Sequence, residues 1–135
     1  MILKTYTRIF TNDAEATLRI LRPLHASEPH LRFRFDPWQL IGIGDVLIVG
    51  GTDDALAPIR GSLGPWIVTD IDETRALLVD AGAEITQDIA AVPTGRMMYA
   101  RHRDGAVVEY VQWTPELVEQ LIAAPQRAGK LASQL

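Results

Sequence analysis

Residues 66–113 read WIVTDIDETRALLVDAGAEITQDIAAVPTGRMMYARHRDGAVVEYVQW and carry the clearest structural pattern in the chain. An apolar run rich in β-formers ends at Thr69, and a helix is predicted over 71–81 because Gly82 stands where a left-handed C-cap belongs. The pair Asp104-Gly105 is a strong hairpin-turn signal. The strands predicted in this stretch are 66–68, 83–89, 96–102 and 106–113. The order is therefore one strand, one helix and three strands (βαβββ).

The first half of the chain repeats this order. A strand is predicted over 3–10, and a helix over 13–24 follows it, with Asn12 as N-cap and Glu15 as its capping-box partner. Apolar residues alternate with arginines over 31–35, which is typical of a strand with one buried face. Two more strands are predicted over 38–43 and 45–49. The two halves align along their length, and 44–48 falls on 105–109.

The predicted organisation is a single α+β domain of two modules with mixed sheets. Module one covers 1–51, a linker covers 52–62, module two covers 63–113, and a C-terminal helix and tail cover 114–135. Thr114 precedes Pro115 as a helix start, and Pro125 is expected to end that helix.

Composition excludes several functions. The chain has 135 residues, a formal net charge of −4 and no cysteine, so disulfide frameworks, thiolate metal sites and thiol catalysis are excluded. The acidic balance and scattered arginines argue against nucleic acid as a partner. No apolar run reaches the roughly 20 residues of a membrane span, and no signal peptide is recognisable. We therefore expect a cytoplasmic protein without a membrane or nucleic-acid partner.

The motifs of the second module resemble a known superfamily. They are 68–72 (VTDID), 81–85 (AGAEI), 93–96 (PTGR) and 104–110 (DGAVVEY), in this order. With the paired βαβββ plan, they resemble the vicinal oxygen chelate superfamily, which includes glyoxalase I, the bleomycin-resistance proteins and extradiol dioxygenases. The resemblance implies two curved sheets around a cavity, usually in a homodimer.

Enzymes of that superfamily hold a divalent metal with one residue on the first and last strand of each module. Carried onto this chain, the last-strand positions are Ile48 and Glu109, and the first-strand positions fall near Thr5 and Leu63. Glu109 is the only one of ligand type, and one carboxylate is inadequate for such a site. We therefore expect no metal and no other cofactor. Metal chemistry with His102 or a residue of a partner subunit stays open as an alternative.

Because the metal ligands are missing, the resemblance favours superfamily members that bind a small molecule without converting it. Examples are resistance proteins that sequester a drug in a cleft lined by aromatic side chains. The candidate ligand-binding residues are Glu109, Trp38, Phe33, Phe35, Tyr99 and Arg34. Trp66 is expected to pack under the second helix. Which face of the strand 31–35 lines the cavity is left open. A buried Glu109 needs an arginine partner, a cationic ligand or a raised pKa. Arg34, Arg96 and Arg101 lie on strands that could reach it.

The sequence therefore predicts a metal-independent small-molecule binding protein that sequesters an aromatic or natural-product ligand, acting as a homodimer in antibiotic resistance. The alternative is a metal-dependent lyase, isomerase or dioxygenase of the same superfamily. A third hypothesis is metal-free acid–base catalysis by Glu109, as the one catalytic candidate. Whether the protein is an enzyme stays open at this level.

Overall fold

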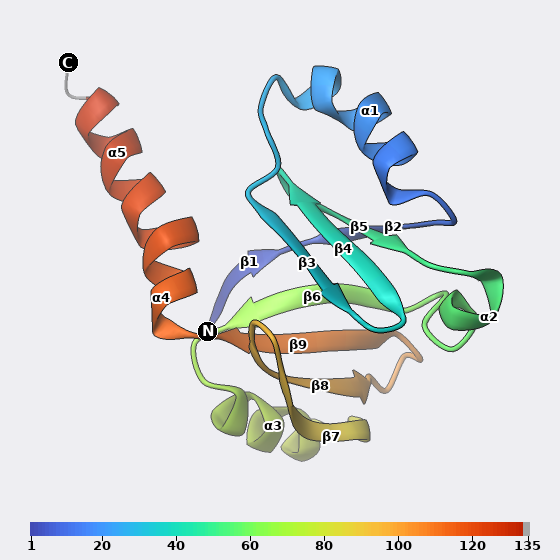
Figure 1. Ribbon diagram of the computed structural model, residues 1–135. Coiled ribbons are helices and arrows are strands. Elements are labelled where there is room, and N and C mark those ends of the chain that lie inside the picture. The colour runs from blue at the N-terminus through green and yellow to red at the C-terminus, as the bar shows by residue number, and fades with distance from the viewer. Residues whose placement is uncertain (134–135) are drawn as a thin grey trace.

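The computed structural model describes residues 1–133 and consists of two sheets with a helix on the outer face of each (Figure 1). The strands of the first sheet, in their order across it, are β2 (Thr7–Thr11), β5 (Val46–Gly50), β4 (Trp38–Ile43) and β3 (Leu31–Phe35). The second sheet has the order β1 (Ile2–Thr5), β6 (Leu63–Val68), β9 (Val107–Trp113), β8 (Gly95–Arg101) and β7 (Glu84–Val92). Helix α1 (Ala14–His25) covers the first sheet and α3 (Ile71–Asp80) the second. The predicted α+β class with a repeated βαβββ order is confirmed.

The prediction of one continuous strand over 3–10 is wrong, because Tyr6 divides it between the sheets. Strand β1 pairs antiparallel with β6, whereas β2 pairs parallel with β5. The main-chain N–H of Tyr6 donates to the Pro65 carbonyl at 3.1 Å, and that of Thr7 donates to the Asp45 carbonyl at 2.8 Å. The hydrogen-bond partner thus changes sheets within one residue. The first strand of the chain joins the two sheets edge to edge.

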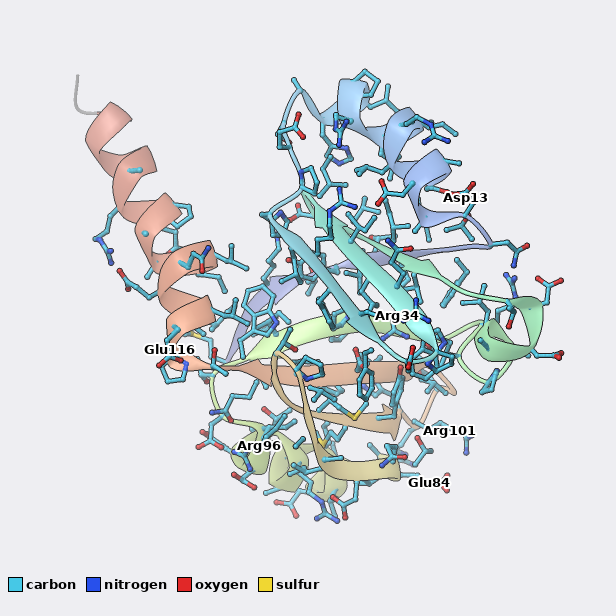
Figure 2. The ribbon with its side chains drawn as sticks, viewed as in Figure 1. Asp13, Arg34, Glu84, Arg96, Arg101 and Glu116 are labelled. Atoms are coloured by element: carbon cyan, nitrogen blue, oxygen red, sulfur yellow. The ribbon has the colours of Figure 1, made fainter. Side chains whose placement is uncertain are left out.

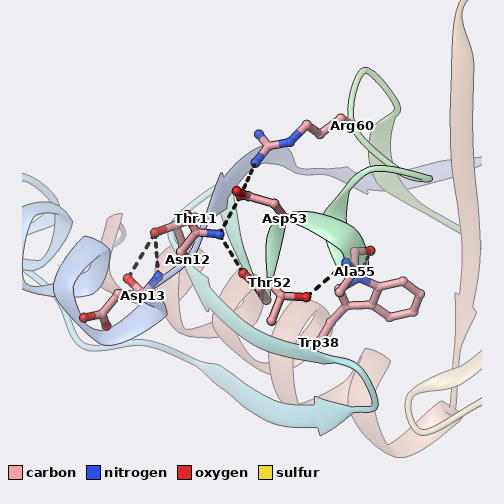
Figure 3. A network of polar contacts seen from close by, with 9 residues as sticks. Thr11, Asn12, Asp13, Trp38, Thr52, Asp53, Ala55 and Arg60 are labelled. Carbon is pink, nitrogen blue, oxygen red and sulfur yellow. Dashed lines mark hydrogen bonds and ion pairs between the residues drawn. The ribbon is translucent and has the colours of Figure 1, made fainter.

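Local capping explains where the first helix begins and how the linker folds. The N-cap of α1 is Asp13, whose carboxylate accepts from the Ala16 N–H at 3.0 Å, so the prediction of Asn12 is wrong by one position. Asn12 instead donates to the Gly51 carbonyl and to Asp53, which ties the end of β2 to the linker (Figure 3). Within the linker, Thr52 caps a short helix, α2 (Asp53–Leu56).

The C-terminal helix is longer than predicted. It begins at Pro115 after the Thr114 cap, as expected, with α4 (Pro115–Val118), then passes through a π turn, η1 (Glu119–Ala123), into α5 (Ala124–Ser133). Pro125 does not end it. Pro125 is the second residue after the π turn, where the main-chain hydrogen bonds are already shifted from the α pattern, and the helix continues past a residue that has no N–H. Within 1–133, no helix is long and apolar enough to cross a membrane.

Three clusters of apolar side chains follow from strand alternation. One lies under α1 and includes Leu18 and Ile48, and a second lies under α3 and includes Ile71 and Met98. The third lies between the sheets and is closed at one end by Ile122 of the C-terminal helix. Since successive residues of a strand face opposite ways, each sheet has one face under a helix and one face toward the space between the sheets.

Candidate functional site

A cavity of about 690 Å³ lies between the two sheets. Its wall combines residues from strands of both modules, so both halves of the chain contribute to it. From the first sheet and its loops the wall includes Tyr6, Arg8, Leu31, Phe33, Phe35, Trp38, Leu40, Leu47, Val49, Ile59, Arg60 and Ser62. From the second sheet it includes Gln87, Ala90, Val92, Met97, Tyr99, Arg101, Val107, Glu109, Val111 and Trp113.

A buried ion pair forms the polar centre of this cavity. Arg8 Nη2 on β2 donates to Glu109 Oε1 on β9 at 2.8 Å, and the two side chains are 5% and 17% exposed. Arg8 Nη1 donates to the Ser62 hydroxyl at 2.6 Å and to the Tyr99 hydroxyl at 3.1 Å. One guanidinium therefore connects both modules and the segment between them.

The electrostatics of this cluster follow from its burial. Removal from water raises the pKa of Glu109 above its usual value, and the nearby Arg8 charge with a hydrogen bond from Tyr99 offsets part of that rise. Burial, and then the negative charge of Glu109, raises the pKa of Tyr99 to about 12. The phenol therefore stays protonated and serves as a hydrogen-bond donor at neutral pH.

An aromatic wall faces the polar centre from the first sheet. Phe33 and Phe35 both line the cavity, which settles the orientation of β3, and Trp38 lies beside Phe35 with ring centroids 6.0 Å apart. The Trp38 indole N–H donates to the Ala55 carbonyl of α2 at 2.9 Å (Figure 3). This bond fixes the indole plane at the cavity edge without using a polar group of the cavity.

A second hydrogen-bonded pair lies beside the cavity wall at Tyr6. The Tyr6 hydroxyl lies 2.6 Å from His30 Nε2, and its ring lies 6.2 Å from that of Trp113. Burial raises the pKa of Tyr6 and, followed by the charge of Lys4, lowers that of His30. A neutral pair therefore borders an apolar end of the pocket.

The structure brings most of the predicted site residues together. Glu109, Tyr99, Trp38, Phe33 and Phe35 all line the cavity. Arg34 does not line it: its guanidinium lies outside, against Asp36, with the two side chains 67% and 82% exposed. Trp66 packs in the cluster under α3, as expected.

Arg8 was not predicted, although it is the partner that Glu109 requires. Of the three arginines expected to reach Glu109, Arg34 and Arg96 pair with surface aspartates, and Arg101 pairs with Glu84. The sequence does contain one signal for Arg8. With Lys4 it is one of two cations in this β-rich segment, and it lies two residues from Tyr6 and two from Phe10, on the face that those aromatic residues share.

The positions assigned to metal ligands are wrong in register for the first module. Ile48 is fully buried under α1, and the neighbouring residues Leu47 and Val49 face the cavity instead. Thr5 does not line the cavity, and Leu63 does not either. At the corresponding places the wall offers Tyr6, Arg8, Leu47 and Pro65, of which none is a usual metal ligand.

The donor set therefore does not fit the divalent metal that the superfamily resemblance implies. Among the described residues, no group of three or more His, Cys, Asp or Glu side chains gathers in one place. His102 is hydrogen-bonded to the Tyr110 hydroxyl at 2.7 Å, within the cluster under α3 and away from the cavity. A cation next to Glu109 would also lie against the Arg8 guanidinium, which repels it.

Comparison with known proteins identifies solved structures that have a similar fold. No family model and no curated protein matches the sequence. Among solved structures, an uncharacterised protein from Methanosarcina mazei is 30% identical, with a TM-score of 0.77 over 84% of this chain and 94% of that one. Methylmalonyl-CoA epimerase from Mycobacterium tuberculosis is 14% identical, with a TM-score of 0.66 over 87% and 93%.

A Streptomyces coelicolor methylmalonyl-CoA epimerase variant in complex with 2-nitronate-propionyl-CoA is 17% identical, with a TM-score of 0.64 over 84% of this chain and 99% of that one. These epimerases have the glyoxalase-like fold of the vicinal oxygen chelate superfamily, and this chain has the same fold. The chain belongs to the same protein family as the uncharacterised Methanosarcina mazei protein.

Proposed function

We propose that the protein binds a small organic molecule between its sheets without a metal ion, and that it sequesters this ligand, an aromatic or natural-product compound, rather than converting it. The observation that carries the proposal is the Arg8–Glu109 ion pair at the centre of an aromatic cavity. The Arg8 guanidinium provides the positive charge beside Glu109 that a metal ion would otherwise provide. A metal ion at this place would need further ligands. The ion pair also leaves hydrogen-bonding groups on the cavity wall.

The size and lining of the cavity support an organic ligand. Its volume of about 690 Å³ lies within the range of drug-sized binding sites, roughly 300–1,000 Å³. The rings of Phe33, Phe35 and Trp38 present apolar faces along one wall. A flat ligand stacked on them would gain about 0.5–1.5 kcal/mol per aromatic pair beyond the burial of its area.

A second candidate function rests on the position of Glu109, a carboxyl group that lines the cavity and whose pKa burial raises. A carboxyl group that holds its proton more tightly than usual is suited to general acid–base work near neutral pH. The two functions differ in what happens to the ligand. When a bound carbon acid is incubated in D₂O, sequestration returns it unlabelled, and proton abstraction by Glu109 exchanges its acidic hydrogen for deuterium.

The metal-free part of the proposal has a test that needs no knowledge of the ligand. Thermal unfolding of chelator-treated protein is measured as Mn²⁺, Fe²⁺, Ni²⁺, Zn²⁺ or Mg²⁺ is added. We expect no shift in Tm. A specific site at 100 times its dissociation constant would add about 2.7 kcal/mol, or about 10 °C for a chain of this size. A rise in Tm on addition of metal that is lost in Glu109→Gln but kept in the surface variant Glu84→Gln would overturn the proposal that the site binds no metal.

A further inference from the structure

The net charge of the cavity wall is opposite in sign to the net charge of the whole chain. The chain as a whole has a formal net charge of −4. The charged side chains on the cavity wall are Arg8, Arg60, Arg101 and Glu109, which give an excess of two positive charges. The wall is therefore locally cationic within an acidic protein.

The acids that pair with the two outer arginines do not cancel this excess. Arg60 lies 3.7 Å from Asp53, and Arg101 lies 2.9 Å from Glu84. The two carboxylates are 83% and 67% exposed and lie outside the cavity wall. Each arginine lies on the cavity wall and its acid lies outside that wall, so a ligand inside the cavity is nearer to the arginine than to the acid that pairs with it.

The cationic groups gather at one end of the cavity. On neighbouring strands β8 and β9, Tyr99 lies opposite Glu109 and Arg101 lies opposite Val107. Figure 2 shows Arg101 beside Glu84 at the end of the second sheet that lies away from the C-terminal helix. Arg60 stacks over the Phe10 ring, with its guanidinium carbon 6.0 Å from the ring centroid. It stands two residues before Ser62, which contacts Arg8.

The other end of the same wall is apolar. Gly95 lies opposite Trp113 on the same two strands, six residues along from Arg101. At about 3.3 Å per residue, roughly 20 Å separates the cationic end from the end that Trp113 closes. From the cationic end, the polar pair Tyr99 and Glu109 comes first, and the apolar residues Met97, Val111 and Ala90 follow it. This arrangement suits a ligand with one charged end and an extended apolar body.

The hydrogen-bonding groups at the cationic end favour an acceptor on the ligand. Arg8 has five N–H hydrogens, of which its contacts with Ser62, Tyr99 and Glu109 use three. Its Nε has no partner among the described residues, but it is enclosed by protein atoms and does not face the cavity. Glu109, in contrast, already accepts from Arg8 and Tyr99. The guanidinium groups of Arg60 and Arg101, which also line the wall, add N–H donors that a ligand oxyanion can accept from.

From these observations, and resting on the proposed function, we propose that the ligand is an organic anion. Its carboxylate or similar oxyanion lies between the central Arg8 and the end formed by Arg60 and Arg101, and its aromatic or apolar body extends toward Trp113. Arg101 and Arg60 select for negative charge, and the aromatic wall holds the body whatever the charge of the head.

The test compares three probes of one shape by isothermal titration calorimetry: 2-naphthoate, 2-naphthamide and 2-naphthylmethylammonium. We expect the acid to bind about tenfold more tightly than the amide and the ammonium to bind most weakly. Arg101→Gln and Arg60→Gln should each weaken the acid about fivefold and leave the amide within about twofold. The matched control is Arg34→Gln, a surface arginine between two cavity phenylalanines, which should change neither. Raising sodium chloride from about 50 to about 500 mM should weaken the acid alone.

The outcomes separate this inference from the proposed function. Equal affinities for the three probes would overturn the anion inference and leave a charge-indifferent aromatic site. Tightest binding of the ammonium would also overturn it and would assign recognition to Glu109. If none of the three binds at millimolar concentration, both the inference and the proposed function fail.

Discussion

Replacing Arg8 or Glu109 alone should destabilise the fold far more than replacing both. Arg8→Met leaves a buried carboxylate without its cation, and Glu109→Met leaves a buried guanidinium without its anion. Loss of one partner of a buried pair costs about 3–5 kcal/mol, whereas an apolar replacement of both is often neutral. We expect Arg8→Met/Glu109→Met to lie within about 1 kcal/mol of the wild type. The coupling energy should therefore reach several kcal/mol.

The two single replacements should also differ from each other. Glu109 can escape part of the cost in Arg8→Met by taking up a proton, and burial already raises its pKa. Arg8 has no such escape, because a guanidinium does not lose its proton in a protein. Glu109→Met should fall at the upper end of the range and Arg8→Met at the lower. The deficit of Arg8→Met should shrink as the pH falls toward the ordinary Glu pKa.

Urea unfolding followed by tryptophan fluorescence measures these free energies, provided that the slope m stays constant among the variants. The matched control is the surface pair Arg34 and Asp36, for which the same double cycle should give less than about 1 kcal/mol. A coupling energy for Arg8 and Glu109 no larger than this control would refute the reasoning that burial makes the pair strong.

Three further predictions concern stability. Ile122→Ala should cost about 2–4 kcal/mol, because this side chain, 8% exposed, closes the core between the sheets, whereas the exposed Ile20→Ala should cost under about 0.5 kcal/mol in the same urea assay. Gly95→Ala should lower Tm by about 10 °C or more, since its Cβ would lie 2.1 Å from a main-chain carbonyl oxygen. The control Gly61→Ala should lower Tm less, because no atom lies within 4 Å of its Cβ and only the positive φ is unfavourable. The pKa of Tyr99 is raised to about 12 in the folded protein, so as the pH rises the unfolded chain loses this proton first. The free energy of unfolding should therefore fall between about pH 10 and 12. Tyr99→Phe should lessen that fall.

The fold was predictable where local rules decide it. Alternation over Leu31–Phe35 and the cap at Thr114 each rest on neighbours in the sequence, and the structure confirms both. The division of the first strand at Tyr6 had no local signal, because neither glycine nor proline stands there. Its cause is the pairing of main-chain groups with Pro65 and Asp45, which are distant in the sequence.

Several residues that line the cavity could be predicted singly from the sequence, but the contacts between them could not. Glu109 was identified as a buried acid that needs a partner, yet its partner Arg8 is 101 residues away in the sequence and lies in the other module. The misassignment of Ile48 has a related cause. A one-residue error in aligning the modules exchanges the two faces of a strand, so it moved the candidate from the cavity to the helix-covered side.

The most direct test of the central claim is isothermal titration calorimetry of 2-naphthoate into chelator-treated protein, repeated after addition of a divalent metal ion. The account predicts one site per chain, the same dissociation constant with and without metal, and loss of binding in Trp38→Ala but not in Trp66→Ala, since the first indole lines the cavity and the second packs under α3. Binding that begins only once metal is present, or that is unaffected by Trp38→Ala, would contradict a metal-independent ligand site between the sheets.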